Sequence, residues 1–383
     1  MDQRILGADE AELRAERTSV KWMAFPPDVL PLWVAEMDAA PCPSVVDAVS
    51  AAVRRGDTGY GWAPRYAAAV ARLAQWAWDW EIDHAATTQV TDVMIGATEL
   101  LRLFTDERGP VVISPPVYDS FFGFVDAMGR RRIDAPLTPE GRLDPNALAF
   151  AFREATSRGE RAAYLLCNPQ NPTGVVHTAH ELEMLAALAN EYGIRVVADE
   201  IHAPLTYAGG PAFTPFVTVP GAERALSVFS PSKGWNLAGL KSALVVAGDE
   251  AVDDLRRLHE VHTHGASHIG AIAHCAAMDD GRQWLEQLRG ELAERRDLVG
   301  DLLSTHLPDV RWQAPEATYL AWLDCRALGL GDDPARVFRE RGRVALGSGP
   351  AYAPEQGRGF ARLNFATSPE IITEAVQRMA TAV

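Results

Sequence analysis

The chain has 383 residues, which suggests two or three domains and enough length to bury a large core. Apolar residues make up 48% and charged residues 23%, a balance that excludes disordered, collagenous and fibrous chains. The formal net charge of −15 repels phosphate backbones and anionic membrane surfaces, so nucleic acid and membranes are poor partners. The four cysteines are far apart without a CxxC pair and are interpreted as reduced thiols. No apolar run resembles a leader or a span, and we expect a cytoplasmic protein.

Three parts of the chain differ in their pattern. Residues 1–45 are rich in Pro and Trp, cannot form a domain alone, and are predicted to lie along a domain junction. Within 46–280, short apolar runs alternate with helical patterns, which indicates a mainly parallel sheet wrapped by helices in a large domain. Residues 281–383 begin with long charged helical stretches followed by short strands, which predicts a smaller α/β domain.

One helix of the large domain can be placed closely. Thr178 followed by Glu181 forms a capping box, and Gly193 is a typical left-handed stop. Between them, leucines recur on one helical face. The sequence therefore predicts a helix that starts just after Thr178 and ends at Gly193, between two strands of the sheet.

Polar residues follow four of the predicted strands, and ligands of α/β sheets bind at such carboxyl ends. At residues 96–99 (GATE) a strand is predicted to turn into a helix whose exposed amides would hold an anion, although a structural turn fits equally well. Residues 168–174 (NPQNPTG) form a rigid loop that is either a side-chain platform or a plain turn. Asp199 and Glu200 end an apolar strand, where a carboxylate either caps a helix or neutralises a cation.

The fourth strand end is residues 230–241 (SPSKGWNLAGLK). A lysine between small hydroxyl residues is unusual, because lysines normally occupy solvated faces. A desolvated Lys233 amine would be a nucleophile able to form a Schiff base. The two hydroxyls and the second cation at Lys241 would suit a nearby phosphate.

Together these segments resemble the class I and II aminotransferase family, pyridoxal 5'-phosphate (PLP) enzymes of fold type I. Asn171, Asp199 and Lys233 stand in the family's order, with the NPxNPxG and SxSK patterns around them. The resemblance implies an α/β fold whose large domain has a mainly parallel seven-stranded sheet, with a smaller C-terminal α/β domain.

A narrower resemblance covers nearly the whole chain, to the MalY/PatB-type cystathionine β-lyase group. It rests on residues 17–22 (RTSVKW), 30–38 (LPLWVAEMD), 59–60 (GY), 116–118 (PVY), 199–202 (DEIH), 318–324 (TYLAWLD) and 362–364 (RLN). The chain departs from the group at Glu36, Gln170 and Gly234-Trp235. All of these positions border the expected site, so the departures leave the native substrate open.

The resemblance gives the matched residues roles in catalysis and cofactor binding. Lys233 would hold the cofactor and move the Cα proton, and Asp199 would pair with the pyridine nitrogen. Asn171 and His202 would hydrogen-bond the ring hydroxyl, and Tyr118, otherwise an ordinary buried aromatic, would lie against the ring.

The resemblance also assigns residues to the cofactor's phosphate and to the substrate's carboxylate. The phosphate would be held by Ala97, Thr98, Ser230, Ser232 and Lys241, completed by Tyr60 from a neighbouring subunit of a homodimer. The substrate carboxylate would be clamped by Arg362, with Trp33 and Val34 beside it. A surface salt bridge is the ordinary alternative for an arginine, and the match to RLN favours the clamp.

Five histidines between His259 and His274 are candidates for a metal site. Their spacing is irregular, with no HExxH and no nearby cysteine or paired carboxylate, so solvated or structural histidines are favoured and no metal is expected.

Three functions compete. The leading prediction is β-elimination from cystathionine or another L-cysteine S-conjugate, which yields pyruvate, ammonia and a thiol. An aminotransferase that acts on an L-amino acid shares the same residues. The third hypothesis is a regulatory or binding protein on this fold. The presence of Lys233, Asp199 and Arg362 argues against a loss of catalysis.

Overall fold

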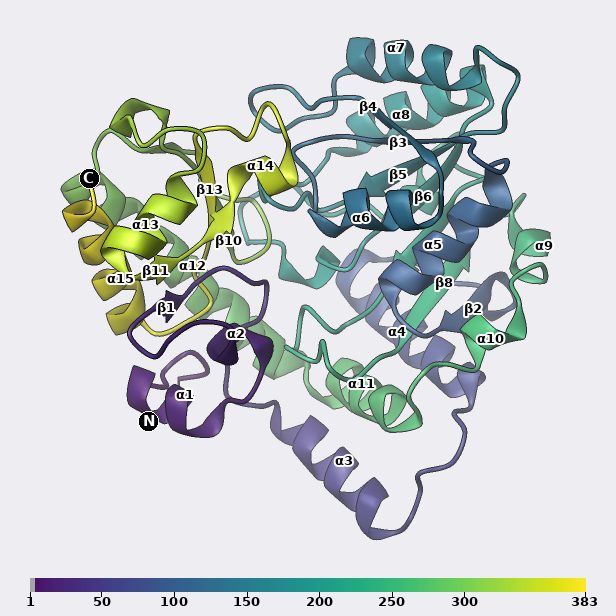
Figure 1. Cartoon of the computed structure of the whole chain (residues 1–383). Helices are drawn as coiled ribbons and strands as arrows, with labels where there is room; N and C mark the ends of the chain where they lie inside the picture. The colour runs from purple at the N-terminus through teal and green to yellow at the C-terminus, as the bar shows by residue number, and fades with distance from the viewer. Residues whose placement is uncertain (1–3) are drawn as a thin grey trace.

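The computed structural model describes residues 4–383, so the first three residues of the predicted segment 1–45 lie outside the described residues. Two lobes stand side by side, with the N-terminal segment and the C-terminus both on the smaller one (Figure 1). Among the described residues, none of the helices combines the length and the apolar character needed to cross a bilayer.

The larger lobe is built on a seven-stranded sheet. Five neighbouring strands are parallel, and β8 runs antiparallel to both of its neighbours, β2 and β7. In sheet order the strands are β2 (Thr87–Val90), β8 (Ala243–Ala247), β7 (Leu226–Phe229), β6 (Arg195–Asp199), β5 (Ala163–Cys167), β3 (Pro110–Ile113) and β4 (Arg131–Asp134). The mainly parallel seven-stranded sheet is therefore confirmed.

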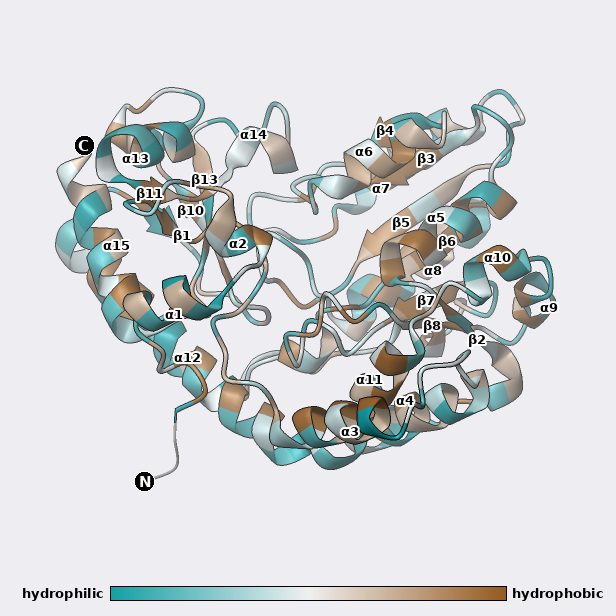
Figure 2. Ribbon diagram, turned by 60° about the horizontal axis from the view of Figure 1, so that its bottom comes forward, coloured by the Kyte–Doolittle hydropathy of each residue, from teal (hydrophilic) through white to brown (hydrophobic). Residues whose placement is uncertain are grey.

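Helices cover both faces of this sheet, and their apolar sides form its core. One face packs on α5 (Val93–Phe104) and α6 (Ser120–Ala127), and the other on α7 (Pro145–Thr156) and α8 (Ala179–Tyr192). The remaining helices of the lobe are α3 (Pro43–Arg54), α4 (Ala63–Trp78), α9 (Val252–Leu255), α10 (Glu260–Thr263) and α11 (His268–Asp280). The strands are mostly apolar, whereas the outer helices mix both kinds of residue (Figure 2).

Helix α8 has the predicted caps. The Thr178 hydroxyl accepts from the Glu181 amide, the Glu181 carboxylate accepts from the Thr178 amide, and Gly193 ends the helix at a φ of 68°. Local chemistry thus fixes both ends of this helix.

The smaller lobe contains an antiparallel sheet of four strands, β12 (Gly347–Ser348), β13 (Phe360–Asn364), β10 (Leu320–Asp324) and β9 (Arg311–Trp312). Its helices are α12 (Arg282–His306), α13 (Pro334–Gly342), α14 (Gly349–Tyr352) and α15 (Pro369–Thr381). Its core is continuous with residues of α4 and α11 from the larger lobe. The division at residues 45 and 280 stays a prediction.

The N-terminal segment joins the smaller lobe. It carries α1 (Glu10–Glu16), α2 (Val20–Met23) and the short strand β1 (Leu30–Pro31), which pairs in parallel with β11 (Val344–Ala345). The backbone amides of Ile5 and Leu6 both donate to the carboxylate of Glu291 on α12, at 2.8 Å each. Residues 33–35, which follow β1, run on toward the space between the lobes.

Candidate active site

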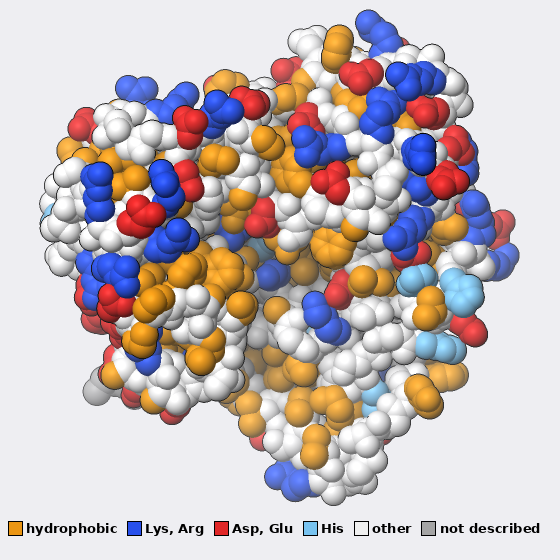
Figure 3. Space-filling model, in the orientation of Figure 1, with side chains coloured by type: hydrophobic (Ala, Val, Ile, Leu, Met, Phe, Trp, Pro, Cys, Tyr) orange, Lys and Arg blue, Asp and Glu red, His pale blue; other side chains and the backbone are white. Residues whose placement is uncertain are grey.

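A cavity of about 570 Å³ lies where the two lobes meet. Figure 3 shows the surface hollowed between the lobes. One wall comes from the carboxyl ends of β5, β6 and β7, and the other from residues 33–35 and β13. The cavity brings together these residues singled out in the sequence: Trp33, Val34, Tyr118, Asn171, Asp199, His202, Ser230, Ser232, Lys233, Lys241 and Arg362.

Lys233 follows β7 and extends its amine into the cavity. Its Nζ donates to the backbone carbonyl of Ala35 at 2.6 Å. Burial lowers the pKa of Lys233 to about 8, the Arg362 guanidinium acts in the same direction, and Asp199 opposes both. This amine therefore loses its proton more readily than an ordinary lysine, which is what a nucleophile or proton acceptor requires.

Asp199 ends β6 with its carboxyl buried in the floor of the cavity. The Ile201 amide donates to its Oδ1 at 3.1 Å. Burial raises the pKa of Asp199 to about 7, against the opposing effects of the Ile201 amide and Lys233. A cationic group placed beside Asp199 would return the carboxyl to its ionised form.

Three further side chains surround these two. His202 is buried, its Nδ1 has no partner among the described residues, and its pKa lies well below the usual value because of burial and the cations Lys233 and Arg362. Asn171 follows β5, and its Oδ1 accepts from Arg362. Tyr118 lines the cavity and packs edge-on against Phe121, with ring centroids 5.9 Å apart.

Arg362 lies on β13 and is anchored from both walls. Its two terminal nitrogens donate to the side chain of Asn171 at 3.0 Å and to the carbonyl of Trp33 at 2.7 Å. Its guanidinium carbon stands 4.6 Å from the ring centroid of Tyr352. Its Nε is buried without a partner in residues 4–383, which leaves one donor of the guanidinium unsatisfied.

The anion-binding end of the cavity differs from the sequence prediction. Helix α5 begins at Val93, with Asp92 as its cap, and not at residues 96–99. Ala97 and Thr98 therefore lie inside the helix and do not line the cavity. Amides at that depth bond to carbonyls one turn back, whereas amides of the first turn have no such partner.

Val93 and Met94 supply the first-turn amides that the prediction missed, and both line the cavity. The small residues at 96–97 lie inside α5 and serve its packing. A Cβ on Gly96 would lie 2.8 Å from Val90, so the glycine permits helix α5 to approach the sheet and does not mark a turn. The usable signal is Asp92, a helix cap directly after a strand.

Ser230, Ser232 and Lys241 reach the same end of the cavity. The Ser230 hydroxyl donates to the Ser242 carbonyl at 2.8 Å and accepts from the Ser232 amide at 3.3 Å. Lys241 pairs with Asp92 at 3.1 Å, and its side chain stays 55% exposed. An exposed cation, two hydroxyls and the first-turn amides of α5 thus line this cavity.

Tyr60 is not part of this cavity. It lies on the loop between α3 and α4 and is 96% exposed, next to Trp62, which is 73% exposed. Two large side chains on one loop therefore face outward from this chain.

Three of the candidate metal-binding histidines each have a different partner. His262 pairs with Glu99 at 3.0 Å, His268 with Asp57 at 2.9 Å, and the buried His274 with the Tyr66 hydroxyl at 3.1 Å. Within residues 4–383, no group of three or more potential ligands is arranged to hold a metal.

Comparisons with known proteins agree with this geometry. The sequence model described as aminotransferase class I and II matches residues 27–379. The chain belongs to the class I and II aminotransferase family. A Mycobacterium leprae protein named "Putative cystathionine beta-lyase" is 49% identical over 383 residues, covering 96% of this chain and 95% of that protein. The "Cystathionine beta-lyase PatB" of Bacillus subtilis is 30% identical over 392 residues, covering 98% and 99%.

A solved structure extends the comparison to three dimensions. The crystal structure of a "putative plp-dependent beta-cystathionase" from Corynebacterium diphtheriae superposes with a TM-score of 0.91 at 33% identity, and covers 99% of both chains. Within the family the chain therefore belongs to the MalY/PatB-type group and has the fold type I architecture.

The cavity of this family member fits PLP. The buried Asp199 carboxyl needs a cation, which a protonated pyridine nitrogen provides. The partnerless His202 Nδ1 is a hydrogen-bonding group that a ring substituent would satisfy. The amides of Val93 and Met94, with Ser230, Ser232 and Lys241, suit a phosphate, and the Lys233 amine suits an aldehyde carbon.

Proposed function

We propose that this chain is a PLP-dependent carbon–sulfur β-lyase that cleaves cystathionine or another L-cysteine S-conjugate to pyruvate, ammonia and a thiol. The observation that carries the proposal is one cavity holding a poised amine, a buried carboxyl and an anchored guanidinium. The named lyases among its relatives favour this reaction over others of the same family.

Arg362 binds and orients the substrate. Its guanidinium donates charge-assisted hydrogen bonds to the α-carboxylate, and its bonds to Asn171 and Trp33 prevent it from turning away. A carboxylate fixed at this point holds the bond from Cα to its hydrogen within reach of Lys233.

Lys233 holds the cofactor and moves the proton. PLP, when bound, supplies an electron sink that stabilises negative charge at the substrate Cα. Once the substrate amine has taken its place on the cofactor, Lys233 would take the Cα proton with its freed, unprotonated Nζ, and Asp199 would keep its negative charge against the cofactor's ring nitrogen. The electron pair left at Cα then expels the sulfur from Cβ as a thiolate, and water releases pyruvate and ammonia.

An aminotransferase is the second candidate, because the matching family model spans both reactions. The two differ in the fate of the substrate nitrogen. We expect purified enzyme to release pyruvate and free thiol from L-cystathionine with no keto acid present. Product that forms only when a keto acid is supplied, with the amino group recovered on that acid, would establish transamination instead.

We infer in addition that the active unit is a homodimer in which Tyr60 completes the phosphate site of the partner. The support is the outward position of Tyr60 and Trp62 on a loop outside their own cavity. Mixing Tyr60→Phe with Lys233→Ala should restore part of the activity, because one of the two sites in a hybrid dimer is intact. An active monomer in sedimentation would rule out this arrangement.

A further inference from the structure

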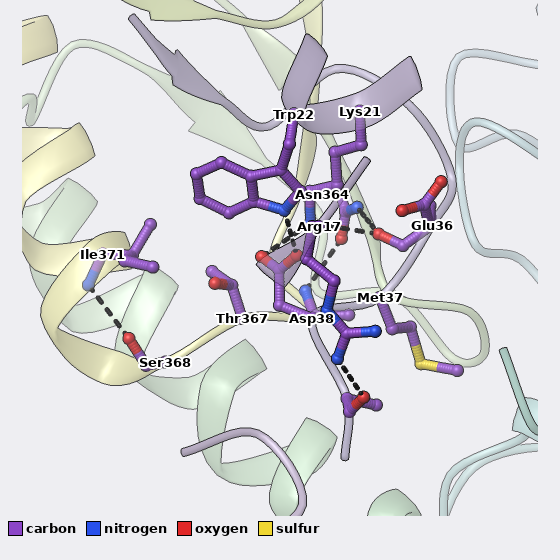
Figure 4. A network of polar contacts seen from close by, with 12 residues as sticks. Arg17, Lys21, Trp22, Glu36, Met37, Asp38, Asn364, Thr367, Ser368 and Ile371 are labelled. Carbon is purple, nitrogen blue, oxygen red and sulfur yellow. Dashed lines mark hydrogen bonds and ion pairs between the residues drawn. The ribbon is translucent and has the colours of Figure 1, made fainter. Parts of the chain in front are cut away.

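Two segments that carry the family resemblance, residues 17–22 and 30–38, contain charged residues that the proposed reaction does not use. The structure pairs these segments with each other (Figure 4). The Lys21 Nζ donates to Oδ2 of Asp38 at 2.7 Å and to the carbonyl of Glu36 at 3.1 Å. The indole nitrogen of Trp22 donates to the other carboxylate oxygen of Asp38 at 2.8 Å. The side-chain donors of Lys21 and Trp22 thus converge on residues 36–38.

The ion pair is buried and lies outside the cavity. The side chains of Lys21 and Asp38 are 0% and 2% exposed, and neither lines the cavity. The pair therefore cannot touch substrate or cofactor directly, and any effect on the reaction must pass through the backbone that it holds.

That backbone presents three successive carbonyls to functional groups. The Trp33 carbonyl accepts from Arg362 at 2.7 Å, and the Ala35 carbonyl accepts from the Lys233 Nζ at 2.6 Å. Between them, the Val34 carbonyl accepts from the side-chain amide of Asn364 at 2.7 Å. One short segment therefore sets the separation between the carboxylate-binding guanidinium and the reactive amine.

Both lobes hold the far end of the same segment. The Asn364 amide also donates to the Glu36 carbonyl at 2.7 Å, and the Asp38 amide donates to the Ala366 carbonyl at 2.9 Å. From the larger lobe, Asn236 accepts from the Met37 amide at 2.9 Å and donates to its carbonyl at 2.8 Å. Residues 33–38 are thus a strap between the lobes, and Lys21 fixes its end.

A buried ion pair is a poor way to gain stability, because desolvation of the two charges offsets their attraction. Directional hydrogen bonds, by contrast, fix a backbone in one position. The chain has three lysines, and the other two, Lys233 and Lys241, line the cavity. We infer that Lys21 is a positioning residue, which together with Asp38 holds the strap so that Arg362 and Lys233 keep their working separation.

Loss of this hold should change the environment of the Lys233 amine. The charged groups that face it are Arg362, Asp199, Glu36 and Lys241, and Glu36 lies on the strap itself. If the strap moves, the Ala35 carbonyl and the Glu36 carboxylate withdraw. Both favour a protonated nitrogen, so the apparent pKa at Lys233 should fall.

The test is the double variant Lys21→Met/Asp38→Asn, which removes both charges and keeps an acceptor for Trp22. We expect kcat/KM on L-cystathionine to fall about 10- to 100-fold, as misplacement by an ångström does in other sites. We also expect the midpoint of the pH titration of the holoenzyme's visible absorption to fall by about half a unit. This second measurement requires no turnover.

The matched control is Arg195→Met/Asp254→Asn. A guanidinium nitrogen of Arg195 lies 2.7 Å from a carboxylate oxygen of Asp254, and each side chain is 14% exposed. The pair joins β6 to α9 outside the cavity. It should change the melting temperature while leaving kcat/KM and the absorption midpoint as in the unmodified enzyme.

The kinetic measurement rests on the proposed lyase function, whereas the spectral measurement does not. Together they distinguish failure of the lyase proposal from failure of the positioning role. A folded double variant with unchanged kcat/KM and unchanged midpoint overturns the positioning role. If the unmodified enzyme makes no pyruvate but the midpoint still falls in the variant, the lyase proposal fails and the positioning role stands. Should the double variant not fold, Lys21→Gln, which shortens the side chain and removes its charge, should lower both kcat/KM and the absorption midpoint to a smaller extent, and no change in either overturns the positioning role.

Discussion

The two walls of the cavity are assembled in different ways. On the larger lobe, Asp199 ends β6 and Lys233 follows β7, and each comes directly after an apolar strand. On the opposite wall, Arg362 bonds to Trp33 across 329 positions of sequence. The first wall is therefore a local product of each strand, whereas the second exists only after the chain ends have come together.

This difference explains which residues have the more robust geometry. Parallel strands meet at one edge by the rules of sheet assembly, so their terminal residues converge without special contacts. The second wall needs the Lys21–Asp38 pair, Asn364 and Arg362 to hold residues 33–38 in place. Substitutions on the first wall should abolish chemistry, and those on the second should loosen substrate positioning.

The largest effect is expected for Lys233→Ala. With no amine to hold the cofactor or accept the proton, kcat should fall by about 10⁴-fold or more, the upper end for loss of acid–base catalysis. Steady-state pyruvate formation measures this effect, and near-ultraviolet circular dichroism controls for folding. A folded variant with more than a few per cent of native turnover would remove Lys233 from its assigned role.

Asp199→Ala should follow, with kcat lowered by about 10²- to 10³-fold, as for loss of one preorganised electrostatic group. Without the carboxylate, the cofactor's ring nitrogen no longer keeps the proton that draws electrons from Cα. The measurement is kcat together with bound cofactor per chain. Normal cofactor content with near-native turnover would contradict the assigned pairing.

On the second wall, Arg362→Ala should act mainly through KM. A charge-assisted hydrogen bond contributes about 1.5 to 3 kcal/mol, so kcat/KM should fall roughly 10- to 150-fold. Arg326→Ala is the control, because that arginine is 65% exposed and pairs with Asp324 in the same lobe. If Arg362→Ala has the same kcat/KM as Arg326→Ala, the substrate carboxylate binds elsewhere.

The smallest effect concerns stability without cofactor. Burial raises the pKa of folded Asp199 to about 7 from 3.8, so between these values the folded state binds a proton that the unfolded state has lost. Stability of the apoprotein therefore falls as pH rises through this window. Asp199→Asn should remove that loss and stabilise apoprotein above pH 7 by roughly 1 to 3 kcal/mol, with no gain near pH 4.

Urea unfolding of both apoproteins at several pH values measures the difference. An Asn variant that is less stable than the native apoprotein at pH 8 would mean that Asp199 finds a cationic partner within the chain itself.

The sequence alone predicted the elements whose signals are local. The caps of α8, the strands β3 to β8 of the larger sheet and the residues after β5, β6 and β7 follow from patterns within a few positions. The start of α5 was wrong because Gly96 serves close packing against Val90, a tertiary contact that composition does not distinguish from a turn.

Other features depend on distant pairing. Nothing near Tyr352 indicates that its ring lies beside Arg362, and nothing near Lys21 indicates that its partner is Asp38. Trp33 and Val34 could be assigned through family resemblance, whereas their hydrogen bonds to β13 appear only in three dimensions.

The central claim is that Lys233 is the residue that holds PLP between the two walls. Borohydride reduction of the purified holoenzyme, followed by peptide mapping, tests it directly, since the chain offers three lysines. The account predicts a reduced cofactor label on the peptide that contains Lys233 and none on those that contain Lys21 or Lys241. A label on either of these two, or a colourless protein that PLP cannot reconstitute, would contradict it.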